Sequence, residues 1–165
     1  MEAMVLLRYL YVVALVLWVG GLIVAGAVVA PSVFGVLQAW NATDGRVLAG
    51  QVFGEVLMRL TWLSYAMFAI MFVTLTLHRL LGARPIRYGV RVGIMLVMLS
   101  MMAATGAYII PRVNAIQAQV SGPVSALAAT DPLREEFDRL HGTSNLLFMI
   151  TAVGGLALCF WESRE

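Results

Sequence analysis

Four stretches without a charged residue divide the chain, and they cover residues 9–37, 60–77, 92–110 and 146–161. Each is close to or longer than the ~20 residues that an α-helix needs to cross the ~30 Å hydrocarbon core of a bilayer. Backbone N–H and C=O groups inside lipid must pair with each other, so such runs form helices. The pattern therefore predicts an all-α fold, a bundle of four transmembrane helices in one domain, residues 1–165.

Helix-capping residues lie well beyond the ends of these apolar stretches. The expected boundaries are Thr43 and Asp44 before the second helix, Gly82 after it, Pro85 at the start of the third, Ser121 near its end, and Asp131 with Pro132 at the start of the fourth. Helices of about 35 residues would be ~50 Å long and would project ~20 Å from one membrane face. We expect residues 44–55 and 133–139 to be helical and outside the lipid.

A short internal repeat links the first and third helices. The segment GAVVAPSV, residues 26–33, aligns with GAYIIPRV, residues 106–113, and Phe53 and Phe137 follow at nearly the same offset. This suggests two helical hairpins, residues 1–82 and 83–165, inserted in parallel. Proline kinks a helix because it frees a carbonyl. Kinks at Pro31 and Pro111 that face each other could open a cavity, as broken helices do in transporters.

Composition supports a membrane protein and excludes several functional classes. Hydrophobic residues make up 61% of the chain and charged residues 12%, and the mean hydropathy is +0.89, so lipid must be the main solvent and partner. A net charge of +2 is too small to suggest a nucleic-acid partner. The single cysteine, Cys159, excludes an internal disulfide and a multi-cysteine metal site. The first helix is too long for a signal peptide, and we treat it as a retained span.

Arginines between the second and third spans predict the orientation. Arg79, Arg84, Arg87 and Arg91 lie there without an acidic residue, and short basic loops stay in the cytoplasm. We therefore expect a multi-pass protein of the bacterial inner membrane, with both termini cytoplasmic. The projecting helices would face outward, where they could join copies of the chain or dock a partner protein.

The densest polar motif is FDRLHGTSN, residues 137–145, at the point where the fourth helix enters the membrane. Asp138, His141, Ser144 and Asn145 recur at helical spacing within it. His141 could be a haem or metal ligand or a proton carrier. The interpretation that we favour is an interfacial histidine that hydrogen-bonds inside the bundle.

Further polar residues border the apolar spans on the same side as this motif. Arg59 and Arg112 flank the second and third spans, and Glu55 lies four residues before Arg59, which favours a helical ion pair. Ionisable groups near the membrane interior are candidates for function, although arginines there also extend to lipid phosphates. The candidate ligand-binding residues are Glu55, Arg59, Arg112, Asn114, His141, Ser144 and Asn145. We expect Arg59, Arg112 and His141 to meet around one cavity at the outer membrane boundary.

Methionines cluster on the second and third helices. Met67 and Met71 lie on the second, and Met95, Met98 and the pair 101–102 on the third. Thioethers bind Cu(I), so a copper path is one interpretation. Methionine is also a flexible filler of apolar space, which is the interpretation we favour. Haem and copper are therefore possible cofactors that the sequence does not favour.

Several segments resemble a known family. The first-helix segment LWVGGLIVAGAVVAPSVFGVL, then AGQVFGEVL, PRVN and FDRLHGTSN, resemble the transmembrane protein 205-like family of small four-helix membrane proteins. This resemblance implies fold and location. A weaker likeness connects the first helix to copper resistance protein D and to protoporphyrinogen oxidases of the HemJ type. The chain lacks the histidine that the HemJ type carries early in that helix.

Three functional hypotheses follow. The leading one is a non-enzymatic membrane protein that binds or passes a small ligand or ion near the outer membrane boundary. The alternatives are a haem- or metal-dependent redox protein using His141, and an accessory or scaffolding subunit that docks a partner through its projecting helices. The chain contains no Walker loop, dinucleotide-binding glycine pattern, HExxH or GxSxG motif, which favours a role other than catalysis.

Overall fold

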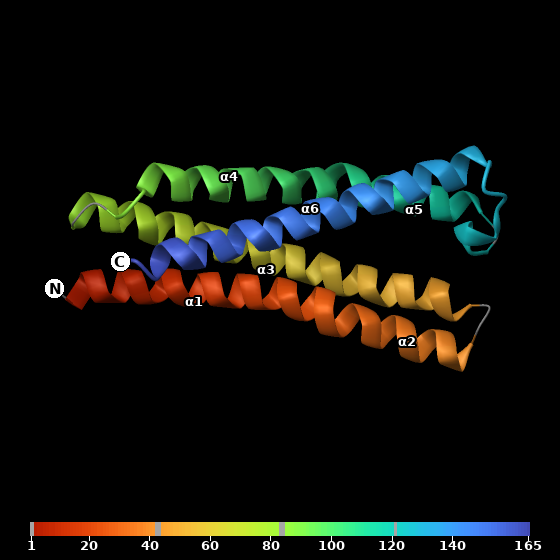
Figure 1. The fold of residues 1–165 in the computed structure, drawn as a ribbon, viewed down its shortest axis with the longest axis horizontal. Helices are drawn as coiled ribbons and strands as arrows, with labels where there is room; N and C mark the ends of the chain where they lie inside the picture. Colours follow the sequence, from red (N-terminus) through yellow and green to blue (C-terminus); the bar gives the residue numbers. More distant parts are fainter. Residues whose placement is uncertain (1, 42–43, 83–84, 121) are drawn as a thin grey trace.

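The protein is a bundle of four long antiparallel helical rods (Figure 1). The computed structural model describes residues 2–41, 44–82, 85–120 and 122–165. The rods are Glu2–Trp40, Gly45–Leu81, Tyr88–Gln119 and Pro132–Glu162, with 39, 37, 32 and 31 residues, and all four are long and apolar enough to cross a membrane. Within the described residues the chain forms no strand. The predicted all-α fold with four membrane-spanning helices is confirmed, and the chain is a multi-pass membrane protein.

Two of the rods are interrupted by a wide π-helical turn. The first rod consists of α1 (Glu2–Val24), the π turn η1 (Ala25–Val29) and α2 (Ala30–Trp40), and the second is α3 (Gly45–Leu81). The third consists of α4 (Tyr88–Ala104), the π turn η2 (Thr105–Ile109) and α5 (Ile110–Gln119). A 3₁₀ turn, η3 (Val124–Ala126), then leads to α6 (Pro132–Glu162). The chain thus forms two hairpins, with the α1–α2 rod against α3, and the α4–α5 rod against α6 (Figure 1).

The two π turns occupy the same place relative to Pro31 and Pro111. In each, a backbone N–H reaches five residues back, from Ala30 to the carbonyl of Ala25 and from Ile110 to that of Thr105. A proline ring collides with the carbonyl four residues before it in a regular α-helix, and a wider turn relieves that collision. The matched turns support the proposal that the two hairpins are a repeat.

The two ends of the bundle differ in packing. We call the end that holds both termini and the α3–α4 connection the closed end, and the end with the two hairpin tips the open end (Figure 1). Towards the closed end all four rods share one core, with Trp18 fully buried. The other buried members of this core are Tyr11, Ala14, Leu15, Val19, Leu22, Met71, Leu75, Met95, Met98 and Leu158. The burial of Met71, Met95 and Met98 fits the packing role that we favoured for the methionines.

Two glycines of α6 allow close helix contacts in this core, one between the two hairpins and one within the second hairpin. A Cβ atom on Gly155 of α6 would lie 2.5 Å from Val19 Cγ2 of α1, and one on Gly154 would lie 2.9 Å from Met98 Sδ of α4. Small residues allow such contact between helices in lipid, where close packing is the main attraction.

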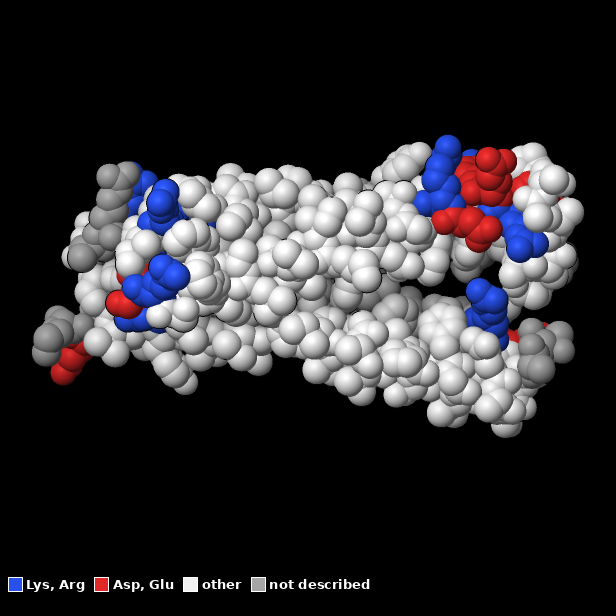
Figure 2. Space-filling view, in the orientation of Figure 1, with Lys and Arg blue, Asp and Glu red and all other residues white. Residues whose placement is uncertain are grey.

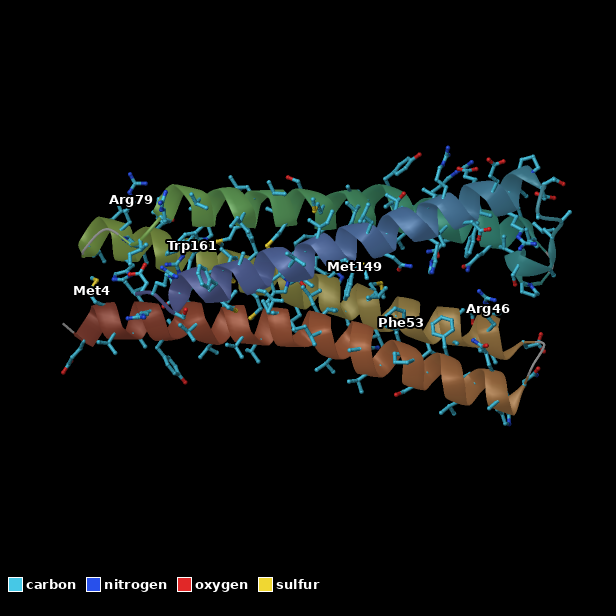
Figure 3. All side chains as sticks on the ribbon, viewed as in Figure 1. Met4, Arg46, Phe53, Arg79, Met149 and Trp161 are labelled. Atoms are coloured by element: carbon cyan, nitrogen blue, oxygen red, sulfur yellow. The ribbon has the colours of Figure 1, made fainter. Side chains whose placement is uncertain are left out.

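At the open end the hairpins separate. A smaller core of Ile109, Ile116, Val124 and Leu140 belongs to the second hairpin alone, and α2 packs on α3 and buries no residue. In the space-filling view a slit lies between the two hairpins at this end (Figure 2). Arg46 points from α3 towards it (Figure 3).

Some of the predicted helix boundaries need correction. The third rod begins at Tyr88 and not at Pro85. Arg87, the residue before Tyr88, has a left-handed conformation with φ of 53°, which a helix cannot contain. That rod ends at Gln119, and Ser121 lies outside the described residues, as does Thr43. Asp44 takes the N-cap position of α3 without a side-chain hydrogen bond.

Other boundaries agree with the sequence. The second rod ends at Leu81, with Gly82 as its cap residue. The Asp131 carboxylate accepts a hydrogen bond from the Leu133 N–H at 2.8 Å and so caps α6, as predicted. Of the segments expected to project, residues 44–55 and 133–139, the structure has 45–55 and 133–139 as helix, and their position outside the lipid stays a prediction.

Candidate functional site

A cavity of about 80 Å³ lies between the two hairpins, at the level of the π turn η2. All four rods contribute to its wall. The lining residues are Leu22, Leu57, Leu60, Thr61, Ser64, Met101, Met102, Thr105, Ile110, Ser144, Leu147, Phe148 and Thr151. None of these side chains is charged. Its volume is several times the roughly 10–15 Å³ that one water molecule needs.

Five hydroxyl groups give this cavity its polar character. Thr61, Ser64, Thr105 and Thr151 each donate to a carbonyl of their own helix four residues earlier, over 2.7–3.0 Å. A hydroxyl has one proton and two lone pairs, so these four oxygens can still accept hydrogen bonds. Ser144 has no hydrogen-bond partner in the part of the chain that the structure describes, and it can both donate and accept.

The cavity therefore suits a mainly apolar molecule with a small polar group. Leucine, isoleucine, phenylalanine and methionine side chains form most of the wall, and they favour hydrocarbon. Four of the hydroxyl groups already donate their protons to backbone carbonyls, so they can only accept a further hydrogen bond. They therefore favour a ligand that carries a hydrogen-bond donor. Ligand sites in proteins commonly combine an apolar wall with a few polar groups that fix orientation.

Of the seven candidate residues that the sequence suggested, Ser144 lines this cavity. Glu55 and Arg59 form the ion pair that their spacing predicts, with Arg59 Nε 2.9 Å from Glu55 Oε1, but the Arg59 side chain is 79% exposed. Asn114 and Asn145 are exposed on α5 and α6.

Arg112 and His141 engage partners of the second hairpin. The Arg112 guanidinium holds both carboxylate oxygens of Glu136, at 2.6 and 2.8 Å. The exposed His141 ring stacks on Phe137, with centroids 6.0 Å apart. In the described part of the chain, no hydrogen bond, ion pair or ring contact joins Arg59 to Arg112 or to His141, so the expected meeting of these three side chains is not seen. Asp138, of the same polar motif, pairs with Arg134 at 3.8 Å.

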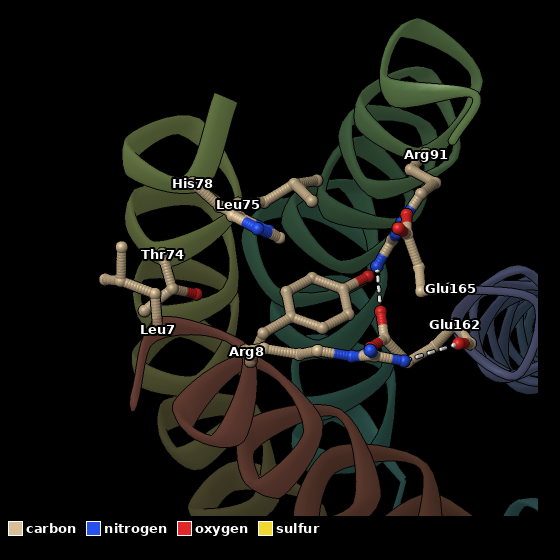
Figure 4. Close-up of a pocket in the computed structure, with 9 residues that line it drawn as sticks. Leu7, Arg8, Thr74, Leu75, His78, Arg91, Glu162 and Glu165 are labelled. Atoms are coloured by element: carbon tan, nitrogen blue, oxygen red, sulfur yellow. Dashed lines mark hydrogen bonds and ion pairs between the residues drawn. The ribbon is translucent and has the colours of Figure 1, made fainter. Parts of the chain in front are cut away.

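A second polar cluster, which the sequence analysis missed, lies at the closed end (Figure 4). Arg91 begins the apolar part of α4, and its side chain is 1% exposed. Its Nη1 donates to Glu165 at 2.9 Å and its Nη2 to Glu162 at 2.5 Å. Arg8 of α1 donates from Nε to the other oxygen of Glu162 at 2.8 Å. We call these four residues the buried ion network.

Tyr11 completes the packing around this network. The Arg91 guanidinium carbon lies 4.6 Å from the centre of the Tyr11 ring, which adds a cation–π contact in a buried site. The adjoining space of about 10 Å³ is bordered also by Thr74, Leu75 and His78, and it has room for about one water molecule. The network ties α1, α4 and α6 together, so it acts as a joint between the hairpins.

A metal centre would need several ligand side chains close together. Among the described residues, no three histidine, cysteine, aspartate or glutamate side chains gather closely enough to hold a metal ion. His141 has Phe137 as its ring partner.

Comparison with known proteins identifies a family. A family model described as a domain of unknown function, DUF4149, matches residues 13–122, which include both π turns and parts of both hairpins. Searches of curated proteins and of solved structures give no match. The narrower resemblance to transmembrane protein 205-like proteins stays a prediction. Because the match covers well over half of the chain, this protein belongs to the DUF4149 family.

Proposed function

We propose that this protein binds a small lipophilic molecule with a hydrogen-bond donor in the hydroxyl-lined cavity between its two hairpins. The observation that carries this proposal is the composition of the cavity wall, in which five hydroxyl groups stand among apolar side chains from all four rods. The cavity borders η2, and π turns are frequent at functional sites.

The slit at the open end is the proposed route to the cavity. The hairpins are separated at this end (Figure 2), which would let a molecule enter from the bilayer or from the membrane surface. The other predicted site residues would form a polar rim along this route. These residues are Glu55, Arg59, Arg112, Asn114, His141 and Asn145. Such a rim would orient the polar group of an entering molecule while its apolar part enters first.

A photoreactive octanol that carries a diazirine tests this proposal. The probe has an apolar chain and one donor, and it labels the residues that it contacts. Purified protein in detergent should be labelled chiefly on residues 57–64, 101–110 and 144–151, which line the cavity, and excess octanol should compete. An equivalent diazirine alkane without the hydroxyl should label these segments less.

A pair of neighbouring substitutions provides the control. Ser144→Leu places a larger side chain in the cavity and should reduce the labelling several-fold. Thr143→Leu changes the preceding residue of α6, an exposed threonine that donates to the Arg139 carbonyl. This variant should leave the labelling unchanged. Labelling spread over the lipid-facing surface, with equal intensity in both variants, would contradict the proposal.

The orientation of the protein is a separate proposal. We place the closed end in the cytoplasm, because Arg79, Arg87 and Arg91 lie there in and beside the short α3–α4 connection. A cysteine at Ile86, which is 42% exposed, in a Cys159→Ser background should resist membrane-impermeant thiol reagents in intact cells. Ready labelling would reverse the orientation.

A further inference from the structure

Apart from Glu2, the described charged residues at the closed end fall into two sets. In the buried ion network, Arg8 and Arg91 are balanced by Glu162 and Glu165. A second set consists of Arg79, Arg87 and Arg164, which are all exposed. None of these three forms an ion pair or donates a side-chain hydrogen bond within the described residues. Their positive charge is therefore uncompensated by the protein.

Each of the three exposed arginines lies against an aromatic ring. The guanidinium carbon is 4.3 Å from the ring centre of Tyr88 for Arg79, 5.9 Å from that of Trp161 for Arg87, and 4.6 Å from that of Phe160 for Arg164. A guanidinium that stacks through its face keeps the N–H groups along its edge free to donate. The aromatic rings thus position three guanidinium groups whose N–H donors are free to bind a ligand.

These contacts form one continuous surface strip over α3, α4 and α6. Arg87 is the chain neighbour of Tyr88, and the rings of Phe160 and Trp161 meet edge to face at 5.5 Å. The pairs are therefore linked, from Arg79 through Tyr88, Arg87, Trp161 and Phe160 to Arg164. Figure 3 places Arg79 and Trp161 at the same end of the bundle. We call these six residues the arginine–aromatic strip.

The residue types around the strip place it, by inference, at the depth of lipid headgroups. Exposed apolar side chains lead up to it on the same helices, among them Leu77 and Val90. Tryptophan and tyrosine are enriched where the hydrocarbon core meets the headgroups. Free guanidinium N–H groups at that depth are suited to phosphate oxygens.

We propose that the arginine–aromatic strip binds the headgroup phosphate of anionic phospholipids. A zwitterionic lipid carries an ammonium group that competes for its phosphate, whereas phosphatidylglycerol does not, so a strip with three unbalanced positive charges prefers the anionic lipid. This site is independent of the cavity between the hairpins and of any ligand held there. Its occupant also bridges the two hairpins, because Arg79 belongs to α3 and the other two arginines to the second hairpin.

Spin-labelled lipids measure this preference directly. The full chain is reconstituted in phosphatidylcholine vesicles that contain spin-labelled phosphatidylglycerol or spin-labelled phosphatidylcholine, and electron paramagnetic resonance reports the fraction of each that the protein immobilises. The intact protein should immobilise phosphatidylglycerol preferentially, and 1 M NaCl should weaken the preference because salt screens exposed charges.

Charge-matched variants locate the site. Arg79→Gln with Arg87→Gln should reduce the relative affinity for phosphatidylglycerol by roughly fivefold or more, since each arginine near the surface contributes substantially to anionic-lipid binding. Arg46→Gln with Arg139→Gln removes the same charge from the open end and should leave the preference unchanged. Arg164→Gln should have a smaller effect in the same direction as the first pair.

Three results would overturn the proposal. The first is equal immobilisation of the two lipids by the intact protein, and the second is an equal loss of preference in the two double variants. The third is loss of the preference on adding 10 mM inorganic phosphate at constant ionic strength, which would assign the strip to free phosphate. Thermal unfolding of each variant confirms that the compared proteins are folded.

Discussion

The closed and open ends are made from the same two hairpins, yet they pack in opposite ways. In the first rod, α1 buries six residues, including Trp18, whereas α2 continues the same rod and buries none. Both segments are strongly apolar and uncharged from Tyr9 onward. Apolarity alone therefore does not decide which part of a membrane helix is buried, because lipid accepts apolar side chains as readily as a protein core does.

Close approach and buried ion pairs distinguish the closed end. Gly155 lets α6 meet Val19 of α1, and Arg91 links α4 to the last turn of α6. The open end has a core in the second hairpin only. Regions with few buried contacts open at lower free energy than the core, so we expect the hairpins to separate first at the open end.

The largest expected effect comes from removing the central cation of the buried ion network. Arg91→Leu leaves Glu162 and Glu165 without their buried partner, and loss of one member of a buried pair costs about 3–5 kcal/mol. The matched change Arg112→Leu, at an ion pair whose arginine side chain is 44% exposed, should cost about 1 kcal/mol or less. Equilibrium unfolding in detergent compares the two, and equal losses would remove the distinction between the ends.

A pair of glycine substitutions in α6 should have a smaller effect. In Gly155→Ala the new Cβ meets Val19 at 2.5 Å, and overpacking of this kind costs about 1–3 kcal/mol. Gly142→Ala lies in open space on the same helix and should stabilise it by up to about 1 kcal/mol. The same unfolding measurement applies, and a stable Gly155→Ala variant would argue against tight packing between the hairpins.

Substitution of the prolines next to the π turns should affect ligand binding in the cavity to different extents. Pro111→Ala removes the ring that favours the wide turn η2, so α4 and α5 can join as a regular helix. This change moves Thr105 and Ile110 in the cavity wall, and we expect at least a twofold loss of octanol labelling. Pro31→Ala should change labelling less, since Leu22 is the one residue that the first rod contributes to the wall. The reverse order would mean that η2 does not shape the cavity.

Much of the fold was predictable because its signals are local. Uncharged runs of suitable length defined the four rods, and Asp131 with Pro132 marked the start of α6. The prolines marked the two irregular places, although a kink was expected and a π turn is observed. The start of the third rod was predicted wrongly at Pro85, because the left-handed conformation of Arg87 has no clear sequence signal.

The sites were harder to predict because they depend on how the helices face each other. Arg91 and Glu162 each flank an apolar span on the same side of the membrane, so their matching depth was visible in the sequence. Their opposite charges could have suggested a pair, but burial of Arg91 depends on helix rotation. Ser144 was singled out within a polar motif, whereas Thr61, Ser64, Thr105 and Thr151 lie in apolar runs where hydroxyl groups commonly bond to their own helix.

Distances between spin labels at the two ends test the central claim most directly. In a Cys159→Ser background, one variant carries labels at Ala39 of α2 and Ala118 of α5, and another at Leu6 of α1 and Val90 of α4. All four positions are exposed, and each pair joins the two hairpins. Pulsed electron paramagnetic resonance gives the distance distribution for each pair with and without octanol.

We predict a narrow distribution for the closed-end pair that octanol leaves unchanged. The open-end pair should be about twice as broad or more, since the hairpins share no core there, and octanol should shift or narrow it. Equally narrow distributions at both ends, unaffected by octanol, would contradict the claim that a fixed joint at the closed end holds two separable hairpins around a binding cavity.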